Sequence, residues 1–180
     1  QDIKIEPLRH VVFTDLNQLA QSVLNGTEIS IADLFKIVKA SDKDFYINSV
    51  KAFYSSDAVL HSIPESYITK TFDELMASDV YAECYIIEKE GERAGYALLA
   101  KTFSQEAGGI VVWLEEIYIL PEFRSCGLGG KFLRFLKENM KASRLRLELC
   151  PSNSRACDVY KRHDFEILNY NQMIYEKKEP

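Results

Sequence analysis

Residues 110–120 form an apolar stretch that leads, after Pro121, through a glycine-rich turn into a second apolar pattern over 128–140. A continuous apolar run is typical of a strand that is covered on both faces. In 128–140 the apolar residues recur at helical spacing and basic residues lie between them, as expected of an amphipathic helix. A buried strand that turns directly into such a helix predicts an α/β protein in which the helix packs on a sheet.

The other periodicities extend this alternation along the chain. They predict strands over 34–39, 81–89, 94–103, 145–149, 165–168 and 173–176, and helices over 15–24, 45–54, 64–76 and 153–163. The strand at 34–39 competes with a helix, because Ser30 and Asp33 also fit a capping box. We expect one α/β (α+β) domain at 33–180, with a mixed sheet of about six to seven strands flanked by helices, and an N-terminal extension at 1–32.

Charge and cysteine content narrow the classes of partner and compartment. Asp and Glu outnumber Lys and Arg by 27 to 22, which gives a formal net charge of -5. Nucleic acid is therefore a poor partner, because phosphate binding needs a basic face, and a cationic substrate is mildly favoured. No membrane association is expected, since no apolar run approaches the ~20 residues of a membrane span and the first residues lack the pattern of a signal peptide. The four cysteines form no C-x-x-C pair and the three histidines are scattered, so we expect no metal site and a cytoplasmic protein with reduced thiols.

The turn before the predicted helix at 128–140 has the composition of an anion-binding loop. Glycine lets the backbone approach a ligand, and the first N–H groups of the helix have no internal partner and carry the positive end of its dipole. The turn is not a Walker loop, because Phe132 rather than Ser or Thr follows Lys131. It is not a dinucleotide fingerprint either, because Phe132 stands where the third glycine is required. A phosphate-binding turn and a tight turn without a ligand both stay open on this pattern.

Two adjacent acids interrupt the apolar strand. Burying a carboxylate without a partner is costly, so Glu115 and Glu116 either pair with basic side chains, lie at a solvated strand end, or act as a general base or an anchor for a substrate ammonium group. Neighbours on a regular strand point to opposite faces, and only a β-bulge would turn both toward one cleft. On the helix predicted at 153–163, Asn153 and Tyr160 share one face, where Asn153 also fits an N-cap and Tyr160 a core position.

Together these features resemble the GNAT superfamily of N-acetyltransferases. The family's (Q/R)-x-x-G-x-(G/A) turn is matched by Arg124-Ser125-Cys126-Gly127-Leu128-Gly129. Its L-E-(D/E)-L-Y-V strand is similar to Leu114-Glu115-Glu116-Ile117-Tyr118-Ile119. Its N-x-x-A-x-x-x-Y-x-x-x-G-F helix is matched by Asn153, Ala156, Tyr160 and Phe165. The chain departs from the family at Asp164, which replaces a glycine, and at Cys150-Pro151, which replaces a commoner Glu-Pro pair. The resemblance covers residues 33–176.

The resemblance implies that acetyl-CoA binds as cosubstrate where the strands at 110–120 and 145–149 separate. Backbone groups of Ile117, Tyr118 and Ile119 would pair with the pantetheine arm, which the Asn153 side chain would also reach. Amides of the turn would hold the pyrophosphate, and these belong to Arg124, Ser125, Cys126, Gly127, Leu128, Gly129 and Gly130. Acceptor specificity is expected from Trp113 and residues 54–61, and a homodimer is one assembly that the family implies.

We therefore expect an enzyme that moves an acetyl group from acetyl-CoA to a primary amine of a small molecule or peptide by direct attack. Glu115 is the first candidate for the general base, Glu116 is the second, and Tyr160 is the candidate proton donor to the departing thiolate. The alternatives are a non-catalytic acyl-CoA sensor on the same fold, a nucleotide-binding or phosphotransfer domain, and an interaction domain whose glycine turn binds nothing. The phosphotransfer alternative lacks the P-loop Lys-Ser/Thr pair and a Mg²⁺ ligand.

Overall fold

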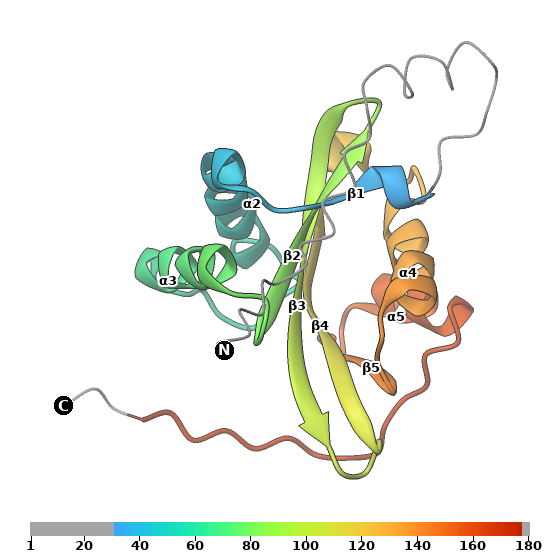
Figure 1. Ribbon diagram of the computed structural model, residues 1–180. Helices are drawn as coiled ribbons and strands as arrows, with labels where there is room; N and C mark the ends of the chain where they lie inside the picture. Colours follow the sequence, from blue (N-terminus) through green and yellow to red (C-terminus); the bar gives the residue numbers. More distant parts are fainter. Residues whose placement is uncertain (1–30, 178–180) are drawn as a thin grey trace, which may run out of the picture.

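The computed structural model describes residues 31–177, and its centre is a five-stranded sheet with helices on both faces (Figure 1). The strands lie in the order β1 (Phe35–Ile37), β2 (Ala82–Lys89), β3 (Glu92–Ser104), β4 (Gly109–Ile119) and β5 (Arg144–Leu147). Pairing is antiparallel from β1 to β4, whereas β5 runs parallel to β4. The predicted mixed α/β sheet is confirmed, including the short first strand.

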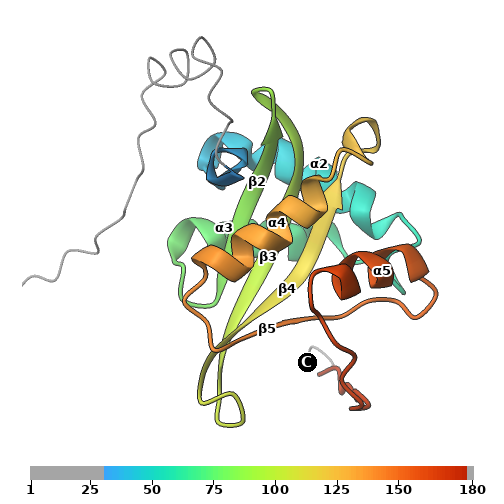
Figure 2. The same ribbon diagram turned by 90° about the vertical axis from the view of Figure 1, so that its right-hand side faces the viewer.

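Helices cover the two faces of the sheet separately. On one face lie α2 (Lys43–Tyr54) and α3 (Glu65–Ala77), and on the other lie α4 (Leu128–Asn139) and α5 (Ser154–Arg162). Figure 2 looks onto the second face, where α4 crosses the strands and α5 lies near the end of β5. Each face has its own core: Tyr46, Val50 and Phe72 pack over the first, and Phe132, Leu133 and Leu136 over the second.

The helix α4 follows directly from its sequence pattern. Its buried positions recur every three or four residues, as Leu128, Phe132, Leu133, Phe135 and Leu136. The rings of Phe132 and Phe135 each lie 5.1 Å from the ring of Phe35, centroid to centroid. This aromatic contact holds the three-residue strand β1 against α4 and explains why so short a strand is ordered.

The strand β4 is irregular at its two acids. Leu98 pairs with Glu116 whereas Leu99 pairs with Leu114, so Glu115 is the extra residue of a β-bulge. Before the bulge Leu114 packs in the α4-face core, and after it Tyr118 packs in the α2–α3 core. The bulge therefore shifts the alternation by one residue and directs Glu115 and Glu116 to the same α2–α3 face.

The pairing of β4 with β5 ends before β4 does. It runs from Val111–Arg144 to Leu114–Leu147, while β4 continues along β3 to Ile119. The sequence predicted this strand to reach residue 149, and the earlier end leaves more of β4 without a neighbour on that side. We call the opening between 115–119 of β4 and the chain after Leu147 the fork.

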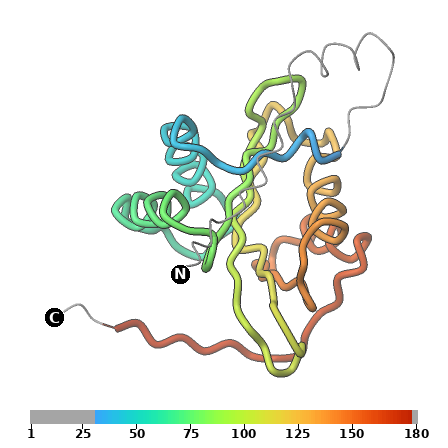
Figure 3. The backbone as a smooth tube through the Cα atoms, viewed as in Figure 1, coloured from blue at the N-terminus to red at the C-terminus, as the bar shows by residue number. Residues whose placement is uncertain are grey.

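The closing strands predicted at 165–168 and 173–176 are wrong. The described chain after α5 has no regular structure from Phe165 onward, so the sheet has five strands within the described residues rather than about six to seven. In the view of Figures 1 and 3 this segment runs from α5 across the lower end of the sheet toward the α2–α3 side. A β-prone composition is insufficient here, because a strand also needs a hydrogen-bonding neighbour along its length. The helix predicted at 15–24 lies outside the described residues, and the boundary between 32 and 33 stays a prediction.

Candidate active site

Glu116 is buried, and two tyrosines satisfy its carboxylate. Only 8% of the surface of this residue is exposed to solvent. Tyr54 Oη donates a hydrogen bond to Oε1 over 2.8 Å, and Tyr96 Oη donates to Oε2 over 2.7 Å. Burial raises the pKa of Glu116, and these two hydrogen bonds oppose the rise. The sequence did not indicate Tyr96 on β3, and it indicated Tyr54 only as part of the predicted specificity segment 54–61, because no local spacing connects either tyrosine to β4.

Glu115 has a different environment although it is the next residue. It is accessible to solvent, and it lines a small cavity of about 40 Å³ with Trp113, Leu114 and Glu148. Partial burial raises the pKa of Glu115, and the negative charges of Glu148 and Glu116 raise it further. An accessible carboxylate whose pKa is raised is suited to accept a proton, whereas Glu116 is already engaged as a hydrogen-bond acceptor.

Beyond Leu114, the edge of β4 that faces the fork carries backbone groups that pair with no strand of the described residues. Leu120 N–H donates to Ala94 of β3 over 2.9 Å, and backbone groups of alternate residues point to opposite edges of a strand. Ile117 and Ile119 therefore direct their backbone groups into the fork, where the Ile119 carbonyl is already bonded by Arg124 Nε, whereas Tyr118 directs its groups toward β3. At Gly95 of β3 a Cβ would lie 2.1 Å from the Tyr118 carbonyl oxygen, which explains the glycine there.

The glycine turn, residues 124–130, joins β4 to α4 with two residues in the left-handed region. These are Ser125 at φ 63° and Gly127 at φ 74°, the latter being the N-cap of α4. The first backbone bond of the helix runs from Lys131 N–H to the Gly127 carbonyl over 3.0 Å. The amides of 128–130 consequently have no intrahelical acceptor and lie at the positive end of the helix dipole.

Basic side chains surround this turn. Arg124 Nε donates to the Ile119 carbonyl over 3.0 Å, and its guanidinium lies 5.5 Å from the Tyr118 ring centroid. Arg155 Nη2 donates to Ser125 Oγ over 3.1 Å, and Lys89 Nζ lies 3.5 Å from Cys126 Sγ. Three cations from three elements thus accompany the free amides, which is the arrangement that an anionic group requires.

The structure explains Gly129 and Gly130 of the turn in different ways. A Cβ at Gly129 would meet nothing within 4 Å, so the protein itself leaves open space beside that amide. A Cβ at Gly130 would lie 2.8 Å from Nε2 of His163, so that glycine lets α5 approach α4. The backbone at Gly129 is therefore accessible to a phosphate-bearing ligand, whereas Gly130 is explained by packing.

The helix α5 places the two remaining predicted residues. Asn153 is its N-cap, with Oδ1 accepting a hydrogen bond from Ala156 N–H over 3.1 Å. The ring of Tyr160 packs against Phe165 at 6.0 Å between centroids, and burial raises the pKa of its hydroxyl. Asp164 adopts φ 65° where the family pattern has glycine, and Lys137 Nζ binds its carboxylate over 2.6 Å. A left-handed Asp held by a lysine thus performs the turn that glycine performs elsewhere.

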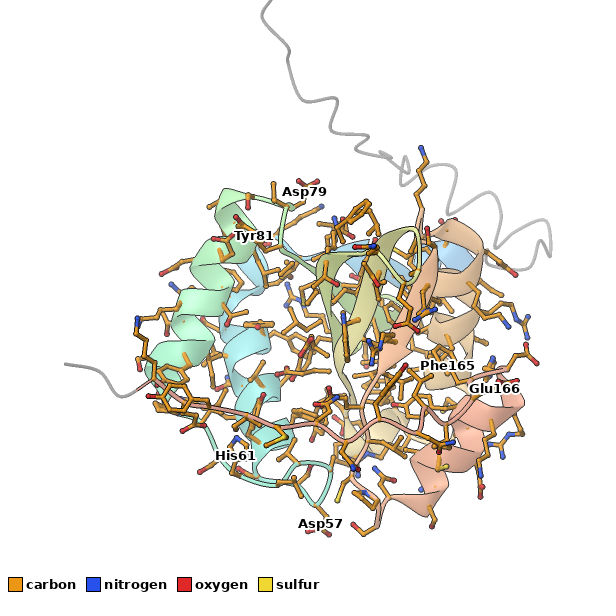
Figure 4. All side chains as sticks on the ribbon, turned by 90° about the horizontal axis from the view of Figure 1, so that it is seen from below. Asp57, His61, Asp79, Tyr81, Phe165 and Glu166 are labelled. Carbon is orange, nitrogen blue, oxygen red and sulfur yellow. The ribbon has the colours of Figure 1, made fainter. Side chains whose placement is uncertain are left out.

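The residues expected to determine acceptor specificity, Trp113 and 54–61, do not all lie beside the two acids. Trp113 lines the cavity beside Glu115, and the guanidinium of Arg146 lies 4.3 Å from its ring centroid. Tyr54 is the member of 54–61 that bonds Glu116, whereas Asp57 and His61 lie farther along the loop between α2 and α3 (Figure 4).

Within residues 31–177 no group of three or more metal-ligating side chains is found. In the same part of the chain, no helix combines the length and apolar character needed to cross a membrane.

Part of this sequence is similar to known proteins. Thialysine N-ε-acetyltransferase of Bos taurus is 37% identical over 70 residues, covering 37% of this chain and 41% of that protein. The enzyme of the same name from Mus musculus is 30% identical over 112 residues, covering 53% of this chain and 65% of that protein. The matches thus span less than two thirds of the length of these relatives.

Solved structures match over a larger share of the chain. An integron cassette protein from the mobile metagenome of Cole Harbour salt marsh superimposes with a TM-score of 0.69 at 20% identity, covering 84% of this chain and 95% of that one. Aminoglycoside acetyltransferase AAC(6')-Iy, solved with the bisubstrate analogue CoA-S-monomethyl-acetylneamine, gives 0.64 at 17% identity, covering 80% and 97%. At these identities the likeness shows a shared fold. The model of the acetyltransferase (GNAT) family matches residues 47–165, and this chain belongs to that family.

Proposed function

We propose that this chain transfers the acetyl group of acetyl-CoA to a primary amine of a small molecule or peptide by direct attack. The observation that carries the proposal is the fork, which has an accessible glutamate on one side and leads to a glycine turn with free amides on the other. The named activity of the thialysine N-ε-acetyltransferases supports an amine acceptor and makes thialysine the first acceptor to test.

The cosubstrate would lie along the open edge of β4. Backbone groups of Ile117 and Ile119 face this space, and the amide nitrogen of Asn153 is the part of that side chain not used in capping α5. The free amides of 128–130 would hold the pyrophosphate, assisted by the three nearby cations. These residues bind and orient acetyl-CoA, which fixes the thioester near the fork and replaces a random encounter by a positioned one.

The chemistry begins with the proton of the acceptor. A lysine-like ammonium group has a pKa of ~10.4, so losing its proton near pH 7 costs about 4–5 kcal/mol. Glu115 accepts this proton, directly or through a water molecule. The amine nitrogen then bonds to the thioester carbon, the carbon–sulfur bond breaks, and the nitrogen loses its second proton to solvent. Tyr160 gives its proton to the departing thiolate, and the burial that raises its pKa keeps the phenol protonated until that step.

Binding and turnover together test this function. Acetyl-CoA is titrated into the protein by calorimetry, and free thiol is then measured with thialysine, lysine, ethylamine, aminoglycosides and peptides. Micromolar binding with thiol release from one acceptor class is the expected result. Binding without release from any acceptor would instead indicate a non-catalytic acyl-CoA sensor, and absence of binding would reject both.

Compartment and assembly are part of the same proposal. We propose a cytoplasmic enzyme, because Cys84, Cys126, Cys150 and Cys157 are all free thiols. A homodimer is the assembly that the family resemblance favours, and sedimentation equilibrium of the full chain measures it.

A further inference from the structure

The parallel register between β4 and β5 places a third carboxylate at the fork. Leu114 and Leu147 are the last paired residues of the two strands. The next residues along each strand are Glu115 and Glu148, which therefore stand opposite each other where the strands separate. Both line the same small cavity beside Trp113. Nothing in the sequence connects these two acids, because the register of a parallel pair is set by packing far from either residue.

Glu148 is held in place without being neutralised. Its Oε1 accepts a hydrogen bond from the side-chain amide of Gln172, in the segment that follows α5. No ion pair within residues 31–177 involves Glu148, and the nearby Arg146 stacks on the Trp113 ring. A neutral amide therefore orients the carboxylate and leaves its negative charge directed at the cavity.

The charged and titratable groups that act on Glu115 come from three elements. Glu116 is its neighbour on β4, Tyr54 is at the end of α2, and Glu148 follows β5. Tyr54 and Glu116 already form a hydrogen bond with each other. Among the described residues, Glu148 forms neither an ion pair nor a hydrogen bond with a hydroxyl group. Its removal therefore changes the electric field at Glu115 with the least effect on the fold.

We propose that Glu148 is a positioning residue that acts through Glu115, holding a second negative charge across the fork so that a cationic acceptor amine is drawn to the base. This inference rests on the proposed acetyl transfer. Glu148 itself takes no part in bond making, because Glu115 receives the proton. Two effects follow, tighter binding of an ammonium group and a base that holds its proton to higher pH.

The test compares Glu148→Gln with the wild-type enzyme, using thialysine and ethylamine as acceptors and thiol release as the assay. We expect KM for these amines to rise about two- to fivefold with a smaller change in kcat, the size of one partly exposed charge contact. The acid limb of the pH profile, where the rate rises as Glu115 loses its proton, moves to lower pH in this variant. Glu148→Asp keeps the charge and restores part of both effects.

The matched control is Glu138→Gln, which makes the same charge change on an exposed position of α4. Its KM and pH profile stay those of the wild type. If wild-type enzyme releases thiol but Glu148→Gln keeps its KM and acid limb, the role of Glu148 is rejected while acetyl transfer stands. If the wild type binds acetyl-CoA and no acceptor releases thiol, acetyl transfer fails and this inference fails with it.

Discussion

The two sides of the fork are built in different ways. The glycine turn is local: its two left-handed residues, its free amides and its open space at Gly129 belong to consecutive positions of the chain. The acidic side is assembled from four elements, since Glu115 and Glu116 lie on β4 while Tyr54, Tyr96 and Glu148 come from α2, β3 and the end of β5. Under the proposed function, a short motif would hold the cosubstrate, whereas the acceptor side would depend on long-range packing.

The largest effect is expected from Glu115→Gln. Removing the proton acceptor lowers kcat by about 10²–10³-fold, and the rise of the rate with pH that follows ionisation of this group flattens. Because Glu115 is accessible and bonds no buried partner, the melting temperature stays within about 2 °C of the wild type. Steady-state kinetics across pH and a thermal melt measure both quantities. Wild-type turnover in this variant would transfer the role of base to another group.

Gly129→Leu tests the local side of the fork. A large side chain enters space that the protein leaves open, so the fold tolerates it, and acetyl-CoA binds about 100-fold more weakly because the backbone is no longer accessible. Gly129→Ala is the matched control. It retains binding, as the family's (G/A) position implies, and stabilises the helix by about 0.5–1 kcal/mol. Equal acetyl-CoA affinity in the Leu variant, measured by calorimetry, would show that the turn only connects β4 to α4.

Glu116→Ala distinguishes the two neighbouring acids by stability. It leaves the hydroxyls of Tyr54 and Tyr96 without their acceptor, and Tyr96 is fully buried. The free energy of unfolding falls by about 2 kcal/mol, measured by urea denaturation. The double variant Glu116→Leu with Tyr96→Phe regains part of this loss, because the buried Tyr96 hydroxyl is then removed together with its acceptor. A Glu116→Ala protein as stable as the wild type would mean that water satisfies these hydroxyls.

These differences explain how far the sequence could be interpreted. Helix α4, the glycine turn and the apolar strand were predictable because each follows from neighbouring residues. The bulge at Glu115 was named only as a condition, since it depends on the register between β3 and β4. Glu148 was missed for the same reason. The strand prediction for the segment after Phe165 was wrong, because its composition favours a strand but the segment pairs with no strand of the sheet.

Tyr160→Phe removes a hydroxyl while keeping the ring that packs on Phe165. If this phenol protonates the leaving thiolate, kcat falls about tenfold, and both the affinity for acetyl-CoA and the melting temperature are retained. The control is Tyr170→Phe, which makes the same change on an exposed residue of the C-terminal segment. A fall in acetyl-CoA affinity with unchanged kcat would assign Tyr160 to binding instead of proton transfer.

The smallest effect concerns stability as a function of pH. The pKa values of Glu115 and Glu116 are raised above the usual 4.5 in the folded protein, so the fold binds protons there more readily than the unfolded chain does. Their contribution to stability is therefore largest when they are protonated and decreases as the pH rises from about 4.5 through the raised folded values. Glu115→Gln removes one of these contributions.

Between pH 4 and pH 8 the melting temperature of Glu115→Gln should consequently decrease less than that of the wild type, by about 1 °C after solvent screening. Asp164→Asn supplies a comparison of opposite sign, because Lys137 holds the pKa of Asp164 below its usual value and that contribution is lost as the pH falls. Thermal melts of the three proteins over this range measure the difference. Parallel curves for wild type and Glu115→Gln would mean that the carboxylate at the fork is solvated like any surface acid, and the electrostatic contrast between the two sides of the site would then rest on Glu116 and Glu148.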